Sequence, residues 1–316
     1  MPFEKIVLVT RKTRLEGLVE KYNTRPQARF YINQSARHRG EESRDAFAFY
    51  QQEHDVYYRA TERLQNELQR LLKVQTVERA FLPNFLFTEA DLVVTVGVDG
   101  LVVNTAKYLH GQPVIAVNPD PEHIDGILLP YTVDQAAGAV SKALAGTQHI
   151  RSVSMAEARL NDGQTLLAFN DLFIGVSNHT SARYAIRWAG KLENHSSSGV
   201  IVSTGAGSTG WLSSMFNMAN GIARGFGSGS PVAPPKLAWD ANKLVFVVRE
   251  PFVSRTSGAE IVCGEISAEA PLTLESLMPE KGVIFSDGVD ADFLQFNSGS
   301  TATIGLSARR TNLFVG

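Results

Sequence analysis

The sequence has 316 residues, of which 44% are hydrophobic and 20% are charged, with a formal net charge of −2 and a single cysteine. This composition argues against a disordered or fibrous chain, and one cysteine excludes an intrachain disulfide and favours a reducing compartment. No segment approaches the roughly 18 apolar residues of a membrane-spanning helix. The near-neutral charge argues against nucleic acid as a partner, and the length favours two domains.

Basic residues are concentrated near the N-terminus. Fifteen of the 30 Lys and Arg residues lie in residues 1–79, and eight basic residues face only two acidic ones between Arg11 and Arg39. Such a run is usually a solvated face of the protein. The alternative is that it lines a site for a phosphate-rich ligand.

The first part of the chain alternates strand-like and helix-like patterns. Residues 41–73 predict an amphipathic helix, because apolar side chains recur there at three- and four-residue spacing, and residues 101–110 predict a short helix. Short apolar runs predict buried strands at residues 5–10, 28–32, 91–97 and 113–118. This alternation indicates a Rossmann-like α/β domain with a helix-covered parallel sheet over residues 1–145.

Short β-rich runs dominate from residue 146 onward. One helix interrupts them, because Trp211, Met215, Met218 and Ile222 share one apolar face. We therefore predict a β-rich C-terminal domain over residues 146–316, with a return of the last residues to the first domain left open. Its expected strands lie at residues 166–176, 200–204, 243–249, 259–263, 283–285 and 301–307.

The first candidate site is the turn Gly97-Val98-Asp99-Gly100, which follows a predicted buried strand and precedes a helix. Parallel α/β sheets bind ligands at this edge, and glycines let backbone N–H groups approach a phosphate. Asp99 is the carboxylate of this turn and could accept a proton from a hydroxyl nucleophile. The alternative is a tight turn in which Asp-Gly only supplies the backbone dihedral angles.

The second candidate site is the loop Ser203-Thr204-Gly205-Ala206-Gly207-Ser208-Thr209-Gly210, which opens the predicted helix at Trp211. Its glycines satisfy the dinucleotide fingerprint G-x-G-x-x-G, but no acidic residue follows before Trp239 to bind a ribose. The loop is therefore interpreted as a ligand cradle of another kind. The alternative is a helix start capped by Ser208 or Thr209.

Two further polar pairs interrupt apolar runs. Asn170-Asp171 lies inside a β-rich run, where a buried carboxylate is costly unless it is paired. It is a candidate for binding sugar hydroxyls, and the alternative is a bulge or strand break. Asp287-Gly288 is interpreted first as a hairpin turn and only second as a site.

The order of these motifs resembles the NAD kinases, within the superfamily of diacylglycerol and sphingosine kinases, and most closely the divergent mitochondrial type. The resemblance covers nearly the whole chain. It is carried by RKTRLE (11–16), VNPDPEHIDGILLP (117–130), AFNDLFIG (168–175), SSGVIVSTGAGSTGW (197–211), REPF (249–252) and SDG (286–288).

The resemblance implies a two-domain kinase that transfers the γ-phosphate of ATP, with Mg²⁺, to the 2′-hydroxyl of the adenosine ribose of NAD. It implies that Asp99 is the catalytic aspartate, at the reacting hydroxyl and the phosphates. No metal ligand is assigned. The expected cofactor-binding residues are Gly97, Gly100, Asn118, Asn170, Asp171, Ser208, Thr209, Gly210, Trp211 and Ser214.

Some positions depart from the family pattern. The phosphate loop has Val98 and Leu101 where the family has glycine and threonine, and Val98 adds a Cβ at a position whose backbone φ could disfavour a β-branched residue. The family's Asn-Glu pair is Asn170-Asp171 here. Two alternatives therefore stay open: a kinase of the same fold acting on a sugar or lipid hydroxyl, and a catalytically inactive nucleotide-binding protein.

The expected partners are small nucleotides, with neither nucleic acid nor membrane. The resemblance further implies a homo-oligomer, with a dimer favoured. No targeting peptide is evident at the N-terminus, so a cytoplasmic location is expected.

Overall fold

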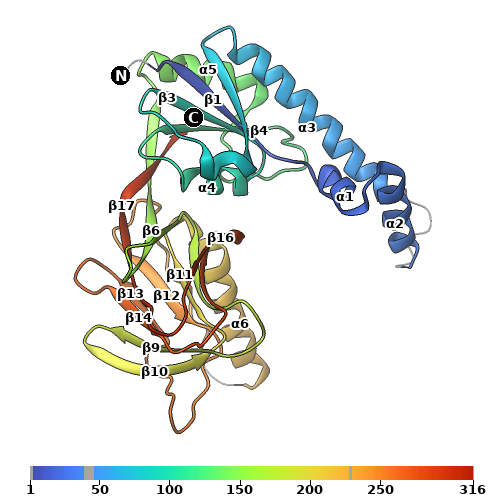
Figure 1. Ribbon diagram of the computed structural model, residues 1–316. Coiled ribbons are helices and arrows are strands. Elements are labelled where there is room, and N and C mark those ends of the chain that lie inside the picture. The colour runs from blue at the N-terminus through green and yellow to red at the C-terminus, as the bar shows by residue number, and fades with distance from the viewer. Residues whose placement is uncertain (1–2, 39–45, 228–229, 316) are drawn as a thin grey trace. The chain divides into compact units, whose positions relative to one another are not determined.

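The computed structural model describes residues 3–38, 46–227 and 230–315. The chain forms two compact units (Figure 1). The first unit comprises residues up to Ile150 together with the chain from Leu313 onward, and the second comprises Arg151–Asn312.

The first unit is built on a parallel sheet in the order β4-β3-β1-β2. Its strands are β1 (Lys5–Thr10), β2 (Lys73–Glu78), β3 (Asp91–Val96), β4 (Pro113–Asn118) and the short β5 (Tyr131–Thr132). Its helices are α1 (Arg14–Tyr22), α2 (Arg25–His38), α3 (Ala46–Leu68), α4 (Asp99–Ala106) and α5 (Val133–Leu144), with a 3₁₀ turn at Arg79–Asn84.

The central strands of this sheet are buried on both faces, as expected for a helix-covered parallel sheet. All residues from Ile6 to Val9 are fully inaccessible to solvent. On one face, α3 and α5 pack over the sheet, with Leu64 and Leu68 of α3 in the same core as Ile6 and Leu8. The predicted α/β class is therefore confirmed.

The strand predicted at residues 28–32 is wrong, because these residues lie within α2. Ala28, Ile32 and Ala36 recur at four-residue spacing. The two alanines are buried, and the partly buried Ile32 packs against a small core that includes Ala28. Phe30 and Tyr31, which made the run look like a strand, are 63% and 47% exposed. A short apolar run alone does not distinguish a strand from one face of a helix.

The second unit is β-rich, as predicted. One sheet has the antiparallel order β13-β12-β11-β8-β15-β16, and β10-β9-β14-β17 forms the other, with β6 paired to β17 and β7. Their inner faces enclose one apolar core. The strands are β6 (His149–Leu160), β7 (Thr165–Ala168), β8 (Asp171–Val176), β9 (Ala182–Trp188), β10 (Lys191–Ser197), β11 (Val200–Ser203), β12 (Leu244–Val248), β13 (Cys263–Ile266), β14 (Leu272–Ser276), β15 (Gly282–Ser286), β16 (Val289–Gln295) and β17 (Thr301–Val315).

The helix predicted at Trp211 is α6 (Trp211–Gly225). Its predicted apolar face is less buried than the pattern suggests, because Met218 and Ile222 are 42% and 55% exposed and Leu212 is the buried side chain. The strand expected at residues 259–263 is displaced, since β13 begins only at Cys263.

Candidate functional site

The strand order of the first unit defines a point at which a ligand is expected. The chain runs from β1 to β2 on one side and then crosses to β3 and β4 on the other, so the connections after β1 and β3 diverge. Ligands of open α/β sheets bind at the carboxyl ends of the strands at such a switch point. Here that edge is formed by Arg11, after β1, and by the Gly97–Gly100 turn, after β3.

The Asp99 turn is held in place by its own carboxylate. The two oxygens accept hydrogen bonds from the backbone N–H groups of Ile127 (3.1 Å) and Leu128 (3.0 Å). Asp99 opens α4, where a carboxylate is favoured by the helix dipole. Each oxygen retains a further lone pair for a ligand.

The two departures from the family loop are accommodated by the fold. The φ of Val98 is −106°, so the expected conflict with a β-branched side chain does not occur. Leu101 is 1% exposed and is part of the packing of α4. A Cβ at Gly97 would lie 3.0 Å from Leu101 Cδ2 and 3.4 Å from Arg11 Cδ, whereas a Cβ at Gly100 would meet nothing within 4 Å.

Asn118 organises the loop that follows β4. Its side-chain amide donates to the backbone oxygen of Ile124 (2.9 Å), and its side-chain oxygen accepts from the backbone N–H of Asp120 (2.9 Å). The residue is 5% exposed. It therefore shapes this edge of the sheet from within, next to the segment that binds Asp99.

In the second unit, the chain breaks at Phe169 and Asn170 between β7 and β8, and Asp287 stabilises this break together with Asp171 at the start of β8. One Asp287 carboxylate oxygen accepts from the backbone N–H groups of Asn170 (2.7 Å) and Asp171 (3.2 Å), and the other accepts from that of Phe169 (3.0 Å). Asp287 and Gly288 have φ angles of 55° and 66°, as in a hairpin turn that requires the left-handed region. The hairpin interpretation of Asp287 therefore misses its second role as an anchor for Asn170-Asp171.

This anchor gives a stability prediction. Asp287→Asn keeps the size and tolerates the left-handed backbone, but its NH₂ group cannot accept a hydrogen bond from a backbone N–H. We expect the unfolding free energy to fall by about 1–3 kcal/mol, measured by urea denaturation. Asp240→Asn, at an exposed position of the same unit, is the matched control; equal stability of the two variants would contradict the anchoring role.

Asp171 is half-buried and faces a second negative charge. Burial, and then the charge of Asp287, raise the pKa of the Asp171 carboxyl to about 7. Asp171 therefore changes its charge near neutral pH, unlike an ordinary aspartate with a pKa of about 3.9.

The raised pKa predicts a pH dependence of stability. In the unfolded chain Asp171 ionises near pH 4, whereas in the folded protein it keeps its proton until about pH 7. Its contribution to stability is therefore complete below about pH 4 and is lost as the pH rises to about 7. Relative to Asp171→Asn, the unfolding free energy of the wild type should fall over this range in urea titrations, and parallel pH profiles would contradict the shift.

The Ser203–Gly210 loop packs directly against this break. The Thr204 hydroxyl donates to the backbone oxygen of Phe169 (2.5 Å), and the Thr204 N–H donates to that of Asn170 (2.9 Å). The backbone of Gly207 also lies close to Asn170, because a Cβ at Gly207 would be 2.1 Å from the Asn170 backbone oxygen. The loop and the Asn170-Asp171 pair are thus held together by hydrogen bonds and close backbone packing.

The capping alternative for this loop is wrong. Ser208 and Thr209 lie in a 3₁₀ turn (Ala206–Thr209), and the Ser208 hydroxyl donates to the backbone oxygen of Gly205 (2.7 Å). α6 starts at Trp211 with Gly210 at its N-cap and no side-chain cap bond. Ser214, one turn into the helix, bonds back to the Gly210 oxygen (3.3 Å).

The Trp211 ring lies in an aromatic cluster beside these residues. It is parallel to Phe173 at a centroid distance of 5.8 Å, and Phe173 stacks on Phe285 at 4.7 Å. The Arg249 guanidinium lies 5.5 Å from the Trp211 ring centroid. These side chains line a pocket that also includes Lys281.

The cluster shares a sheet face with Asp171. Asp171 and Phe173 are two residues apart in β8, so their side chains point to the same face. The role of Phe173 and Phe285 was not evident from the sequence. Arg249 lies in the REPF segment, which was the one available signal.

The described residues contain no group of three or more His, Cys, Asp or Glu side chains arranged to hold a metal ion. In the same described part of the chain, no helix is both long and apolar enough to cross a membrane. The predicted site residues fall into two sets: Gly97, Asp99, Gly100 and Asn118 in the first unit, and Asn170, Asp171, Ser208, Thr209, Gly210, Trp211 and Ser214 in the second.

No family model matches the sequence. Among curated proteins, the chain is 28% identical over 170 residues to the NAD kinase of Chlorobium phaeobacteroides, covering 52% of this chain and 54% of the relative. It is 30% identical over 157 residues to the NAD kinase of Heliobacterium modesticaldum, covering 47% of this chain and 50% of the relative. The chain thus spans about half the length of the curated relatives it matches.

Solved structures match over nearly the whole chain. An Archaeoglobus fulgidus NAD kinase in complex with ATP aligns with a TM-score of 0.55 and 18% identity, over 98% of this chain and 93% of that one. A yeast NADH kinase complexed with NADH aligns with a TM-score of 0.57 and 15% identity, over 100% and 84%. These likenesses show the fold, and the curated relatives add sequence similarity. Together they confirm the predicted resemblance to the NAD kinases.

Proposed function

We propose that this protein transfers the γ-phosphate of ATP to the 2′-hydroxyl of the adenosine ribose of NAD, giving NADP and ADP. The observation that carries the proposal is the Asp99 turn at the switch point of the parallel sheet, with its carboxylate fixed by Ile127 and Leu128. The names of the sequence relatives and the ligands in the titles of the matching structures support the substrate class.

Asp99 acts in this proposal as the general base. A ribose hydroxyl is a weak nucleophile near neutral pH, so a carboxylate within reach accelerates its attack. The hydroxyl oxygen forms a bond to the γ-phosphorus, the bond to the bridging oxygen breaks, ADP leaves, and the hydroxyl proton passes to Asp99. Positioning and charge neutralisation do most of the remaining work in phosphoryl transfer.

The second unit binds NAD in this proposal. Asn170 and Asp171 offer an amide and a carboxyl group to ribose hydroxyls, and the Ser208–Trp211 segment with Ser214 contributes the cradle of the adenosine. Trp211, Phe173 and Arg249 supply aromatic surface and a positive charge on the same side. Aromatic rings and guanidinium groups suit bases and phosphates.

Mg²⁺ completes the proposed reactants by neutralising the charge of the transferred phosphate. It is usually bound by substrate phosphates and one or two carboxylates rather than by an all-protein cage. In this proposal Asp99, at the start of α4, is the carboxylate that would contribute to Mg²⁺ binding alongside the substrate phosphates.

The test is a turnover assay with Mg-ATP and NAD, followed by NADP detection. NADP formation supports the proposal. Turnover with sugar or lipid hydroxyls alone would favour the kinase of another acceptor, and NAD binding without any turnover would favour an inactive nucleotide-binding protein. The homodimer implied by the family is part of the proposal and is tested by light scattering after gel filtration.

A further inference from the structure

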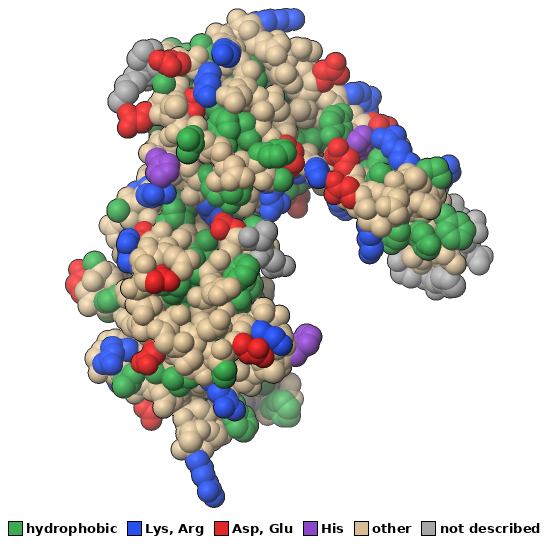
Figure 2. All heavy atoms as spheres, viewed as in Figure 1, with side chains coloured by type: hydrophobic (Ala, Val, Ile, Leu, Met, Phe, Trp, Pro, Cys, Tyr) green, Lys and Arg blue, Asp and Glu red, His purple; other side chains and the backbone are tan. Residues whose placement is uncertain are grey.

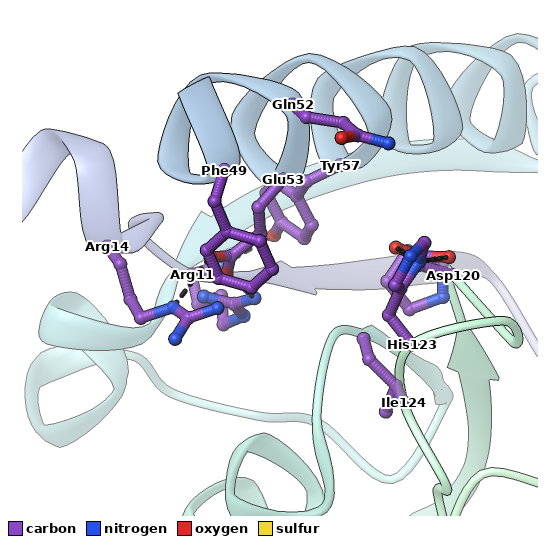
Figure 3. Close-up of a pocket in the computed structure, with 10 residues that line it drawn as sticks. Arg11, Arg14, Phe49, Gln52, Glu53, Tyr57, Asp120, His123 and Ile124 are labelled. Atoms are coloured by element: carbon purple, nitrogen blue, oxygen red, sulfur yellow. Dashed lines mark hydrogen bonds and ion pairs between the residues drawn. The ribbon is translucent and has the colours of Figure 1, made fainter. Parts of the chain in front are cut away.

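A pocket of the first unit lies at the carboxyl edge of its parallel sheet (Figure 3). Its walls come from the segment after β1, from α3 and from the loop after β4. The residues that matter for its chemistry are Arg11, Arg14, Glu53, Asp120 and His123. None of these five is among the site residues that the resemblance assigns, although Arg11 and Arg14 lie in the RKTRLE motif and Asp120 and His123 in VNPDPEHIDGILLP.

One carboxylate holds both arginines of this pocket. Glu53 accepts from Arg11 Nη2 (3.2 Å) through Oε1 and from Arg14 Nε (2.6 Å) through Oε2. Arg11 lies over the Tyr57 ring (5.0 Å to its centroid) and Arg14 over Phe49 (5.0 Å). The two guanidinium groups are thus oriented toward one anion.

The Arg11 side chain is only partly satisfied. It is 13% exposed, and its Nε is buried without a hydrogen-bond partner among the described residues. Its Nη1 donates to the backbone oxygen of Lys12 (3.1 Å) and its Nη2 to Glu53, so an incoming anion would compete with Glu53 for Nη2. The Arg11 Cδ lies 3.4 Å from the position of a Cβ on Gly97, which places the group directly beside the Asp99 turn.

The other charges near the pocket are balanced. Asp120 pairs with His123 (2.9 Å) and raises the pKa of that imidazole. The exposed Lys12 is paired with Glu20 (2.6 Å), and on the face shown in Figure 2 basic and acidic side chains are interspersed. An incoming anion therefore gains most at Arg11 and Arg14, in competition with Glu53.

We propose that Arg11 and Arg14 bind the phosphate chain of the phosphoryl donor, and that Glu53 occupies them as an internal substitute for that chain when no donor is bound. Guanidinium groups bind carboxylate and phosphate with the same paired geometry, so one anion can replace the other. The chemical class of the ligand is a triphosphate or longer phosphate chain. Its identity as the donor rests on the proposed function above.

The test measures binding by calorimetry, without NAD, for ATP and for inorganic tripolyphosphate. Arg11→Ala/Arg14→Ala should weaken both ligands by about tenfold or more, because the contacts are to the phosphates. Glu53→Gln should strengthen both by several-fold, since the competing charge is removed. A gain in affinity cannot result from misfolding. Lys21→Ala, which removes a charge from α1 outside the pocket, is the matched control.

The proposal is overturned if the double variant binds both ligands as Lys21→Ala does, or if Glu53→Gln weakens them. Loss of ATP binding with unchanged tripolyphosphate binding would also overturn it, since the arginines would then recognise the nucleoside. The proposed function can fail independently of this site. If the wild type forms no NADP but still binds tripolyphosphate through Arg11 and Arg14, the phosphate site is retained and the kinase reaction is excluded.

Discussion

Replacing Asp99 by Asn is expected to reduce NADP formation by about 10²–10⁴-fold, the usual contribution of a general base. The amide cannot accept the hydroxyl proton, and the loss should appear in kcat. NAD binding should persist, because Asn170, Asp171 and the Ser208–Trp211 segment are untouched. The assay measures kcat and KM for NAD at saturating Mg-ATP.

The substitution also has a structural effect that must be separated from chemistry. The Asn side chain can accept the hydrogen bond of only one of the Ile127 and Leu128 N–H groups. A melting temperature and a calorimetric NAD affinity therefore accompany the rates. Asp134→Asn changes the same charge at an exposed side chain that pairs with Arg63. An Asp99→Asn enzyme as active as this control would exclude Asp99 as the base.

Periodicity predicts the interior of the first unit well and its edges poorly. The runs at residues 5–10, 91–97 and 113–118 are buried on both faces, so their apolar character reflects their strand positions. β2 (Lys73–Glu78) is missed because three of its six side chains are charged or amide and it packs on one neighbour. The wrong strand at residues 28–32 also arises because the composition of a short run does not show which of its side chains will be buried.

The motifs of the candidate site can be predicted from the sequence, whereas the hydrogen bonds and ion pairs between its distant segments cannot. The Asp99 turn and the Ser203–Gly210 loop stand out because strand, small residues and helix follow one another. The contact of Asp287 with Asn170 joins residues 117 positions apart, and no local pattern indicates it. The pairing of Arg11 with Glu53 similarly requires the fold. The run of basic residues is usually a solvated face, and its alternative interpretation as a phosphate site did not show which two of its members share one carboxylate.

The glycines of the Ser203–Gly210 loop match the dinucleotide fingerprint, but backbone packing accounts for two of them. Gly205, Gly207 and Gly210 satisfy the dinucleotide fingerprint, yet Gly205 and Gly207 are needed for packing against other backbone segments. A Cβ at Gly205 would lie 1.9 Å from the backbone oxygen of Ala238, and one at Gly207 would lie 2.1 Å from that of Asn170. Both neighbours are backbone atoms, which cannot move aside as a side-chain end can.

Gly207→Ala is therefore expected to disturb both the loop and the adjacent Asn170-Asp171 pair. The added Cβ must push the loop away from Asn170, which breaks the Thr204 bonds to Phe169 and Asn170. We expect the unfolding free energy to fall by about 3 kcal/mol, at the upper end for overpacking. NAD affinity should fall at least tenfold, because the cradle and the Asn170-Asp171 pair no longer share one geometry.

Gly221→Ala is the matched control, since its Cβ would meet nothing within 4 Å in α6. Alanine is the better helix former there, so the control should gain about 0.5–1 kcal/mol. Urea denaturation and NAD calorimetry on both variants separate the effects. Gly207→Ala with the stability and affinity of the control would show that the close approach to Asn170 is unnecessary. A destabilised variant of unchanged NAD affinity would instead place the dinucleotide away from this loop.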